Sequence, residues 1–210
     1  MRITGLVVST PDVAATRAAW HRLDVAGLDV EIVGGDPGLA AVVLGVDDVT
    51  ATERLFQRRG LRGDATGFDL GGTHWRLVPA PADDAASPGA LVLDHVVVTS
   101  SDAVRATADF GGRLGLDLRL DRVTDFGYHG LFFRCADAVV EVVVPQDVPT
   151  GPDVLSGLAW RCADLDATHA RLAAATEVSE IRPGRKPGTR VATLRDRALA
   201  VPTLLIGPAA

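Results

Sequence analysis

The sequence predicts an α+β fold built from repeated β-α-β-β-β units. Three observations support this prediction. Short apolar segments rich in β-branched residues alternate with fewer, capped segments of helical spacing. The order of these segments occurs twice after residue 90. A proline-containing stretch at 80–90 has no large apolar residue, so we expect a linker there between units at 1–79 and 91–208.

The first complete unit begins directly after this linker. An apolar strand is expected at 91–98, followed by the helix-start residues 100–102 (Ser-Ser-Asp) and by helical spacing over 103–114. Turn residues then separate three short, β-branched or aromatic strands, expected at 116–122, 130–134 and 139–144.

The second unit has the same order of elements. A strand is expected at 158–162, a helix cap at Asp164 and a helix through Leu172. Three further strands are expected near 177–181, 190–195 and 201–206. The two units share the first strand, the capped helix and an apolar last strand that ends in proline, which indicates an internal repeat.

The N-terminal half repeats the pattern more weakly. Residues 3–12 match 93–102 in strand, turn and helix cap. A strand at 38–48, a helix at 49–59 and a strand at 73–79 match the unit at 157–208. This half is therefore expected to be a shortened copy that lacks about two strands.

Charge and composition exclude several classes of partner. A net charge of -6 and a pI near 5.3 argue against binding to nucleic acid or to an anionic membrane. No apolar run reaches the ~20 residues that cross a bilayer, and the N-terminus lacks the pattern of a signal peptide. Cys135 and Cys162 are expected to be buried free thiols. These features together predict a cytoplasmic protein.

One imidazole and one carboxylate interrupt two strongly apolar strands. His95 lies within 93–98 and Glu141 within 137–145. Burying either group costs several kcal/mol unless it is hydrogen-bonded, paired or bound to a metal. Strand alternation places His95 on one face with Leu93 and Val97, and Glu141 on one face with its neighbours two positions away. These two residues are the first candidates for chemistry.

Paired β-α-β-β-β units with His in the first strand and Glu in the last resemble the vicinal oxygen chelate superfamily. This superfamily includes glyoxalase, bleomycin-resistance and extradiol dioxygenase proteins. The resemblance rests on 93–98 (LDHVVV), 138–142 (AVVEV), 162–167 (CADLDA) and 194–196 (LRD) before the final strand. It implies half-open, cup-shaped sheets with the helices outside.

The resemblance also implies a site. The superfamily's metalloenzymes bind a divalent metal through four ligands from the first and last strands of two units, and His95 and Glu141 match two of them. Gly157 and Leu204 stand at the other two positions. In the N-terminal half, Gly5 stands at the position of His95 and Ala41 at the position of Gly157. Trp75 lies near the last-strand position, and whether Glu31 aligns with Glu141 stays open. That half is expected to be free of metal.

Several interpretations of the pair stay open. Zinc, nickel, manganese or iron would need further ligands, because catalytic zinc uses three protein ligands and a water. The candidates are Asp94, Asp125, Tyr128, His129 and His74. Without a metal, Glu141 in an apolar cup should have a raised pKa and suit acid-base catalysis. The third interpretation is an inert hydrogen-bonded pair.

Other residues are candidates for a ligand pocket. Pockets are mainly apolar with a few polar groups. The residues expected to line one are Trp160, Tyr128, His129, Phe133 and Trp75, and ordinary core packing is the alternative for them. The Gly-containing loop 125–130 is either a lid or a surface turn. The basic stretch 182–190 either receives an acidic ligand or is solvated.

Two functions follow. The first is a glyoxalase-type lyase or isomerase with a divalent metal on His95 and Glu141, acting on a small oxygenated metabolite. The second is a metal-independent binding or resistance protein that sequesters a small hydrophobic or aromatic compound. In both cases the partner is a small molecule, and the chain is a monomer with paired halves or a homodimer.

Overall fold

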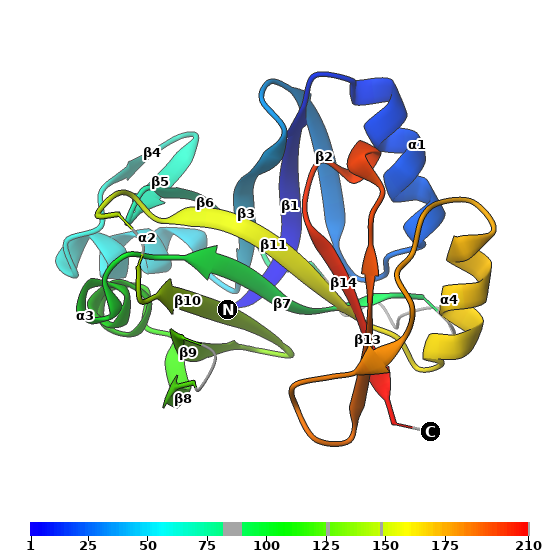
Figure 1. Ribbon diagram of the computed structural model, residues 1–210. Coiled ribbons are helices and arrows are strands. Elements are labelled where there is room, and N and C mark those ends of the chain that lie inside the picture. The colour runs from blue at the N-terminus through cyan, green and yellow to red at the C-terminus, as the bar shows by residue number, and fades with distance from the viewer. Residues whose placement is uncertain (82–89, 125–126, 148, 210) are drawn as a thin grey trace.

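The computed structural model describes residues 1–81, 90–124, 127–147 and 149–209, and their strands form two sheets (Figure 1). The first sheet has six strands in the order β2-β1-β3-β6-β5-β4, and the second has eight in the order β12-β13-β14-β11-β7-β10-β9-β8. Strands β1 to β6 come from residues before 80, and strands β7 to β14 from residues after 91. The expected α+β fold is confirmed.

The N-terminal half contains two helices, each capped by an aspartate. Helix α1 (Val13–Leu23) begins after Asp12, whose carboxylate accepts a hydrogen bond from the amide of Ala15, and α2 (Val49–Arg58) is capped by Asp48 in the same way. The strands are β1 (Arg2–Thr10), β2 (Asp29–Gly34), β3 (Gly38–Val46), β4 (Gly63–Asp64), β5 (Gly67–Leu70) and β6 (Thr73–Pro79). Strands β2, β4 and β5 were not expected, because they are only two to six residues long and Gly, Asp or Glu residues interrupt their few apolar residues.

The C-terminal half follows the expected order with small shifts. Its strands are β7 (Val92–Thr99), β8 (Asp117–Val123), β9 (Tyr128–Cys135), β10 (Ala138–Pro145), β11 (Val154–Arg161), β12 (Arg182–Pro183), β13 (Thr189–Leu194) and β14 (Thr203–Pro208). The expected strand at 177–181 is wrong: only Val178 forms an isolated bridge, to Leu194. The helix expected at 103–114 forms as α3 (Ala103–Ala106) continued by a π-helical segment (Thr107–Arg113).

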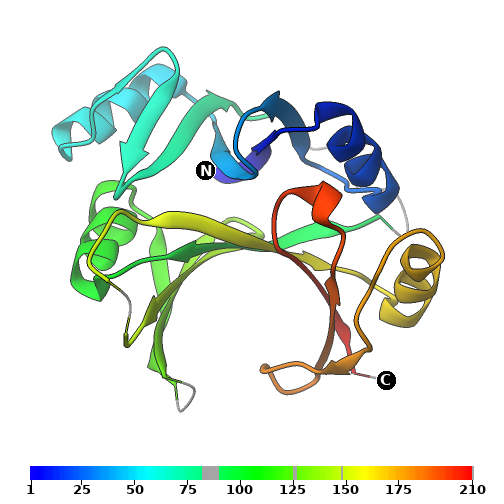
Figure 2. The same cartoon turned by 45° about the horizontal axis from the view of Figure 1, so that its top comes forward.

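The C-terminal sheet has a concave face and a convex face (Figure 2). The N-terminal half lies over the convex face, and α3 and α4 (Leu165–Ala173) flank it. We call the concave side of this sheet the C-terminal cup. Because residues alternate between faces, each strand contributes one row of side chains to the core and one to the cup.

One hydrophobic core joins the two halves. Trp20 of α1 packs edge-on against Trp160 of β11 at 5.9 Å between ring centroids, and its indole N–H donates to the carbonyl of Leu199. Trp75 of β6 packs against Phe110 at 5.8 Å. The halves are therefore packed into one unit. The proposed cut at 80–90 stays a prediction, and residues 82–89 of it lie outside the described residues.

The strand register relates the two halves residue by residue. In β1, Thr4 is a bulge between the pairs Ile3↔Leu44 and Gly5↔Val43. In β7, the residue at the matching position, Asp94, is a bulge in the pairing with β11. The second irregularity of β1, after Val7, matches that of β7, after Val97. Matching bulges support the repeat that the sequence indicates.

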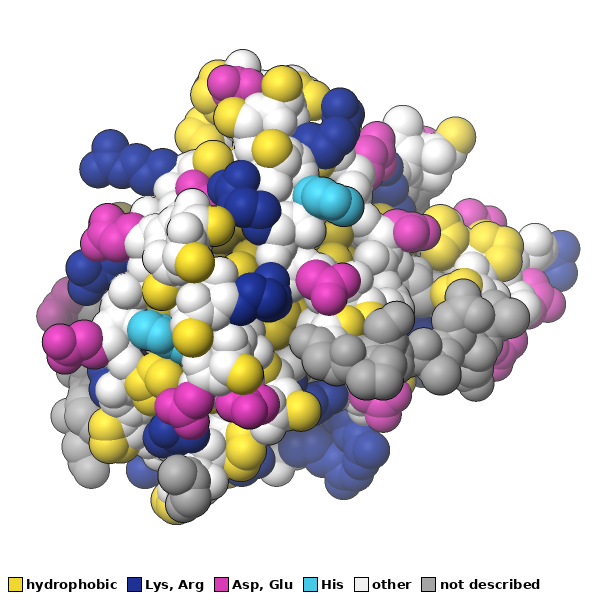
Figure 3. All heavy atoms as spheres, turned by 90° about the vertical axis from the view of Figure 1, so that its right-hand side faces the viewer, with side chains coloured by type: hydrophobic (Ala, Val, Ile, Leu, Met, Phe, Trp, Pro, Cys, Tyr) yellow, Lys and Arg dark blue, Asp and Glu magenta, His cyan; other side chains and the backbone are white. Residues whose placement is uncertain are grey.

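The outer surface carries charges of both signs. Figure 3, which shows the side with α1 and α4, has basic and acidic side chains interspersed and no broad patch of one sign. None of the described helices is long and apolar enough to cross a bilayer.

Candidate functional site

His95 and Glu141 lie on the concave face near the middle of the eight-stranded sheet. Their strand neighbours Val96 and Val140 are fully buried on the convex face. The side chains of His95 and Glu141 keep 16% and 14% of their surface exposed. Nε2 of His95 lies 3.1 Å from Oε2 of Glu141, so the two strands bring the candidate residues into contact. This contact forms the floor of the cup.

The bulge in β7 adds a third polar group that strand alternation had assigned to the other face. Pairing with β11 passes from His95↔Ala159 to Leu93↔Trp160 and leaves Asp94 without a partner. Asp94 and His95 are therefore both on the concave side, and Leu93 is buried in the core. The prediction that Leu93 shares a face with His95 is wrong, because the bulge breaks the two-residue period.

Asp94 fixes the imidazole of His95. Its Oδ2 lies 2.9 Å from Nδ1 of His95, and its Oδ1 lies 3.3 Å from a guanidinium nitrogen of Arg161. The hydrogen bond from His95 holds the pKa of Asp94 below its usual value, with Arg161 and Lys186 adding smaller effects. The Asp94 carboxylate thus accepts a hydrogen bond from Nδ1–H of His95, and Nε2 of His95 is directed at Glu141.

Glu141 has a raised pKa. Burial is the main cause, and the neighbouring carboxylate of Asp94 raises it further, while His95 and Arg185 oppose the shift. A carboxyl group of this kind exchanges a proton with the neighbouring Nε2 more readily than a solvated one. Asp94, His95 and Glu141 together form a connected proton-handling group, which we call the floor triad.

A metal would need donor side chains at all four positions that the resemblance implies as ligands. In β10, Glu141 pairs with Val97, two residues after His95. In β14, Leu204 pairs with Ala159, two residues after Gly157, so Gly157 and Leu204 occupy the related positions. Neither side chain can donate to a metal. No group of three His, Cys, Asp or Glu side chains within the described ranges is arranged to hold an ion. The donor set does not fit a four-ligand centre.

The N-terminal half has an ion pair at the related positions. Val7, two residues after Gly5, pairs with Glu31, so Glu31 aligns with Glu141. Val43, two residues after Ala41, pairs with Arg76. Arg76 and Glu31 lie 2.8 Å apart. Arg76 occupies the last-strand position, and Trp75 lies one residue before it, which agrees with the expectation that Trp75 lies near this position.

Three of the five expected pocket residues lie in the core instead. Trp75, Trp160 and Phe133 are fully buried. Phe133 packs on Phe110 beneath the convex face, and the two tryptophans join the halves. They are core residues because helices and the N-terminal half cover the face of the sheet on which they lie.

The remaining candidate residues lie in different parts of the molecule. The pairing of β9 with β10 places Tyr128 on the face of Glu141. His129 points to the opposite face, where its Nε2 lies 2.5 Å from Asp121. His74 is in the other half of the molecule, bonded to Asp69 and to the carbonyl of Thr66. Asp125, with part of the expected lid, lies outside the described residues.

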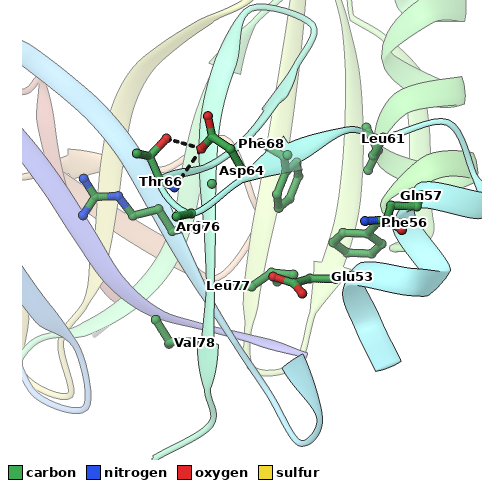
Figure 4. A pocket seen from close by; sticks show the side chains of 13 residues that line it. Glu53, Phe56, Gln57, Leu61, Asp64, Thr66, Phe68, Arg76, Leu77 and Val78 are labelled. Atoms are coloured by element: carbon green, nitrogen blue, oxygen red, sulfur yellow. Dashed lines mark hydrogen bonds between the residues drawn. The ribbon is translucent and has the colours of Figure 1, made fainter. Parts of the chain in front are cut away.

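Two hollows elsewhere do not contain the floor triad. One of about 670 Å³ lies between α2 and β4 to β6, with Phe56 and Phe68 on its apolar side and hydrogen-bonded Asp64 and Thr66 near its rim (Figure 4). Another of about 460 Å³ lies at residues 181–190 and Ala209. The buried Glu141, with its raised pKa, lies in the cup and lines neither hollow, and we therefore place the candidate site in the cup.

Comparison with solved structures identifies the fold. The chain is similar over 100% of its length, and over 93% of the other chain, to a triple mutant of 4-hydroxymandelate synthase from Streptomyces coelicolor, with a TM-score of 0.78 and 13% sequence identity. It is similar over 61% of its length, and over 94% of the other chain, to methylmalonyl-CoA epimerase from Mycobacterium tuberculosis, with a TM-score of 0.50 and 22% identity. No protein-family model and no curated protein sequence matches the chain.

Both of these proteins belong to the vicinal oxygen chelate superfamily, and this chain has the same fold. The resemblance carried by the sequence motifs is therefore confirmed at the level of the fold. Because one fold of this kind supports many activities, the function must be argued from the floor triad.

Proposed function

We propose that the chain binds a small oxygenated metabolite in the C-terminal cup and transfers a proton on it. The observation that supports this proposal is the floor triad, in which a buried carboxyl group with a raised pKa contacts an imidazole fixed by a second carboxylate. Groups with shifted pKa values and direct hydrogen-bond contact are typical of acid-base catalysis.

Each member of the triad has a separate task. Glu141 takes a proton from a carbon beside a carbonyl group, which leaves the electron pair delocalised onto the carbonyl oxygen, and later returns it. His95 shares that proton through Nε2. Asp94 keeps the ring in place and balances positive charge on it. Returning the proton to the same carbon or to a neighbouring one makes this an isomerase reaction. If the electron pair of the enolate instead re-forms a double bond and expels a hydroxyl group, protonated to water, from the next carbon, the reaction is that of a lyase.

The surroundings of the triad suit this chemistry. Val139 and Val143 lie on the same face as Glu141, and Phe132 pairs directly with it in the sheet. Apolar neighbours exclude water from the carboxyl group and maintain its raised pKa. They also provide the apolar contact surface that ligand sites generally have.

The metal-dependent version of this activity stays a prediction. Two donors 3.1 Å apart can contact one ion, since ligands about 2.1 Å from zinc lie about 3.0–3.4 Å from each other. Gly157 and Leu204 supply nothing on the other side, so we base no step on a metal. Elemental analysis of the purified protein and of the His95→Ala variant tests the metal-dependent version. Stoichiometric metal in the wild type that is lost in the variant would support a metalloenzyme.

Exchange of carbon-bound hydrogen tests the proposal. The full chain is incubated in D₂O with pyruvate or with uncharged hydroxyacetone, both of which have acidic C–H bonds, and proton NMR follows the loss of the C–H signal. We expect exchange that Glu141→Gln abolishes. Glu177→Gln is the matched control, because Glu177 is an exposed carboxylate that pairs with Arg195 and lies outside the floor triad.

The alternative function is a binding protein without catalysis. If both compounds exchange at the uncatalysed rate with the wild type and with Glu141→Gln, proton transfer is refuted. Saturable binding of a ligand without exchange would then assign the cup to sequestration.

A further inference from the structure

The two ends of the eight-stranded sheet meet across the mouth of the cup. The turn between β12 and β13 lies at one end of the strand order, and β9 lies next to the other end. Arg185 in this turn donates a hydrogen bond of 2.9 Å to the hydroxyl of Tyr128 in β9. Its guanidinium carbon also lies 5.2 Å from the centroid of the Tyr128 ring. The curvature of the sheet in Figure 2 brings these segments toward each other.

The same turn directs positive charge at the floor triad. Arg185 lies close enough to Glu141, and Lys186 close enough to Asp94, for each cation to interact electrostatically with that carboxyl group. Arg182 pairs with Val191 in the sheet, on the same face as Arg161, which contacts Asp94. The chain carries a net charge of -6, so the local positive charge around the cup is opposite in sign to the net charge of the protein.

One cation of the same stretch has a different environment. Arg190 pairs with Gly207 on the convex face and forms two hydrogen bonds with Asp166 of α4. The basic stretch 182–190 is thus divided: its turn faces the cup, and its last arginine braces a helix on the outside. The sequence could not separate these roles.

We propose that Arg185, positioned by Tyr128 at the mouth of the cup, binds an anionic oxygen group of the ligand, a carboxylate or a phosphate, while Glu141 faces the reacting carbon. This inference rests on the proposed function and specifies its substrate class. A guanidinium fits both anions through its planar fork of N–H donors. The aromatic ring and the hydroxyl of Tyr128 fix the plane of that fork before the ligand arrives, which reduces the entropy lost on binding.

Calorimetric titration of the full chain tests the proposal with charged and uncharged probe pairs. Pyruvate is compared with methyl pyruvate for a carboxylate, and glycerol phosphate with glycerol for a phosphate. We expect one of the anions to bind at least about tenfold more tightly than its uncharged partner, because a hydrogen bond to a charged group is worth that much or more. The tighter pair identifies the anion.

Variants locate the effect. Arg185→Gln should weaken binding of the preferred anion about ten- to a hundredfold and leave the uncharged partner unaffected. Arg185→Lys should recover part of the loss, since it keeps the charge without the fork. Tyr128→Phe should cost a few-fold, through the lost hydroxyl alone. Arg190→Gln is the matched control from the same stretch and should bind as the wild type does.

Three results would overturn the inference: equal binding by Arg185→Gln and Arg190→Gln, equal binding of an anion and its uncharged partner, or no anion binding below a Kd of about 1 mM. Hydrogen exchange separates the two claims. Exchange of hydroxyacetone without anion selectivity would refute this inference and leave the proposed function intact. Anion binding that depends on Arg185, without any hydrogen exchange, would refute proton transfer and leave the anion-binding role of Arg185 intact.

Discussion

Completing the ligand set is the sharpest test of how the two units of the C-terminal half correspond. The double substitution Gly157→His and Leu204→Glu places an imidazole and a carboxylate at the positions that the register relates to His95 and Glu141. An added Cβ at Gly157 would lie 3.3 Å from the carbonyl oxygen of Pro202, so that backbone must shift by a few tenths of an ångström, and its other contacts would be ordinary. We expect the variant to bind Ni²⁺ or Zn²⁺.

The magnitude follows from linkage between metal binding and stability. A metal present at about a hundred times its Kd stabilises the folded protein by about 2.7 kcal/mol. For a chain of this length, each kcal/mol raises the Tm by about 2–4 °C, so the double variant should gain about 5–11 °C. The wild type, with two donors and a metal concentration near its Kd, should gain about 1 °C.

Thermal unfolding of metal-free protein, with and without Ni²⁺ or Zn²⁺, measures this gain. Adding His95→Ala to the double variant should remove it, and Gly157→Ala with Leu204→Gln is the control that changes the same positions without complete ligands. A double variant that folds, by circular dichroism, and gains no more than the wild type would refute the positional correspondence deduced from the strand register.

Three further predictions concern the wild-type architecture. The pKa of Glu141 is higher in the folded protein than the ordinary value of 4.5, so the folded state holds this proton more tightly than the unfolded state does. The free energy of unfolding should therefore fall as the pH rises through that raised pKa. Glu141→Gln should remove this fall in thermal unfolding curves recorded across pH. Trp160→Ala should cost about 3–5 kcal/mol in urea unfolding, because it opens a cavity against Trp20 where the halves meet; a loss below about 1 kcal/mol would contradict the shared core. Gly71→Ala should cost more than about 1 kcal/mol in the same assay, since φ is 64° there and the new methyl group would overlap the buried carboxylate of Asp153.

The sequence determined the parts of this protein that depend on local pattern. Apolar alternation located most strands of the C-terminal half, and Asp102 and Asp164 located the starts of α3 and α4, because both signals arise from neighbouring residues. The same alternation marked His95 and Glu141 as the polar exceptions in apolar strands. Spacing and order were enough to indicate the fold, since the unit occurs repeatedly.

Tertiary structure decided which side chains meet. Asp94 joins the site through a bulge, and a bulge depends on how two strands pair rather than on the residue itself. Trp75, Trp160 and Phe133 became core residues because the N-terminal half and the helices cover the convex face. Alternation assigns a residue to one of two faces, but only packing decides which face is covered.

The mouth of the cup required the full curvature of the sheet. Tyr128 and Arg185 are 57 residues apart in sequence and are separated by nearly the whole strand order, and no local pattern relates them. Their contact exists because strand twist accumulates across eight strands until the ends approach each other. The sequence alone thus identifies His95 and Glu141 as the candidate residues at the floor of the cup, and only the folded sheet shows that Arg185 lies at its mouth.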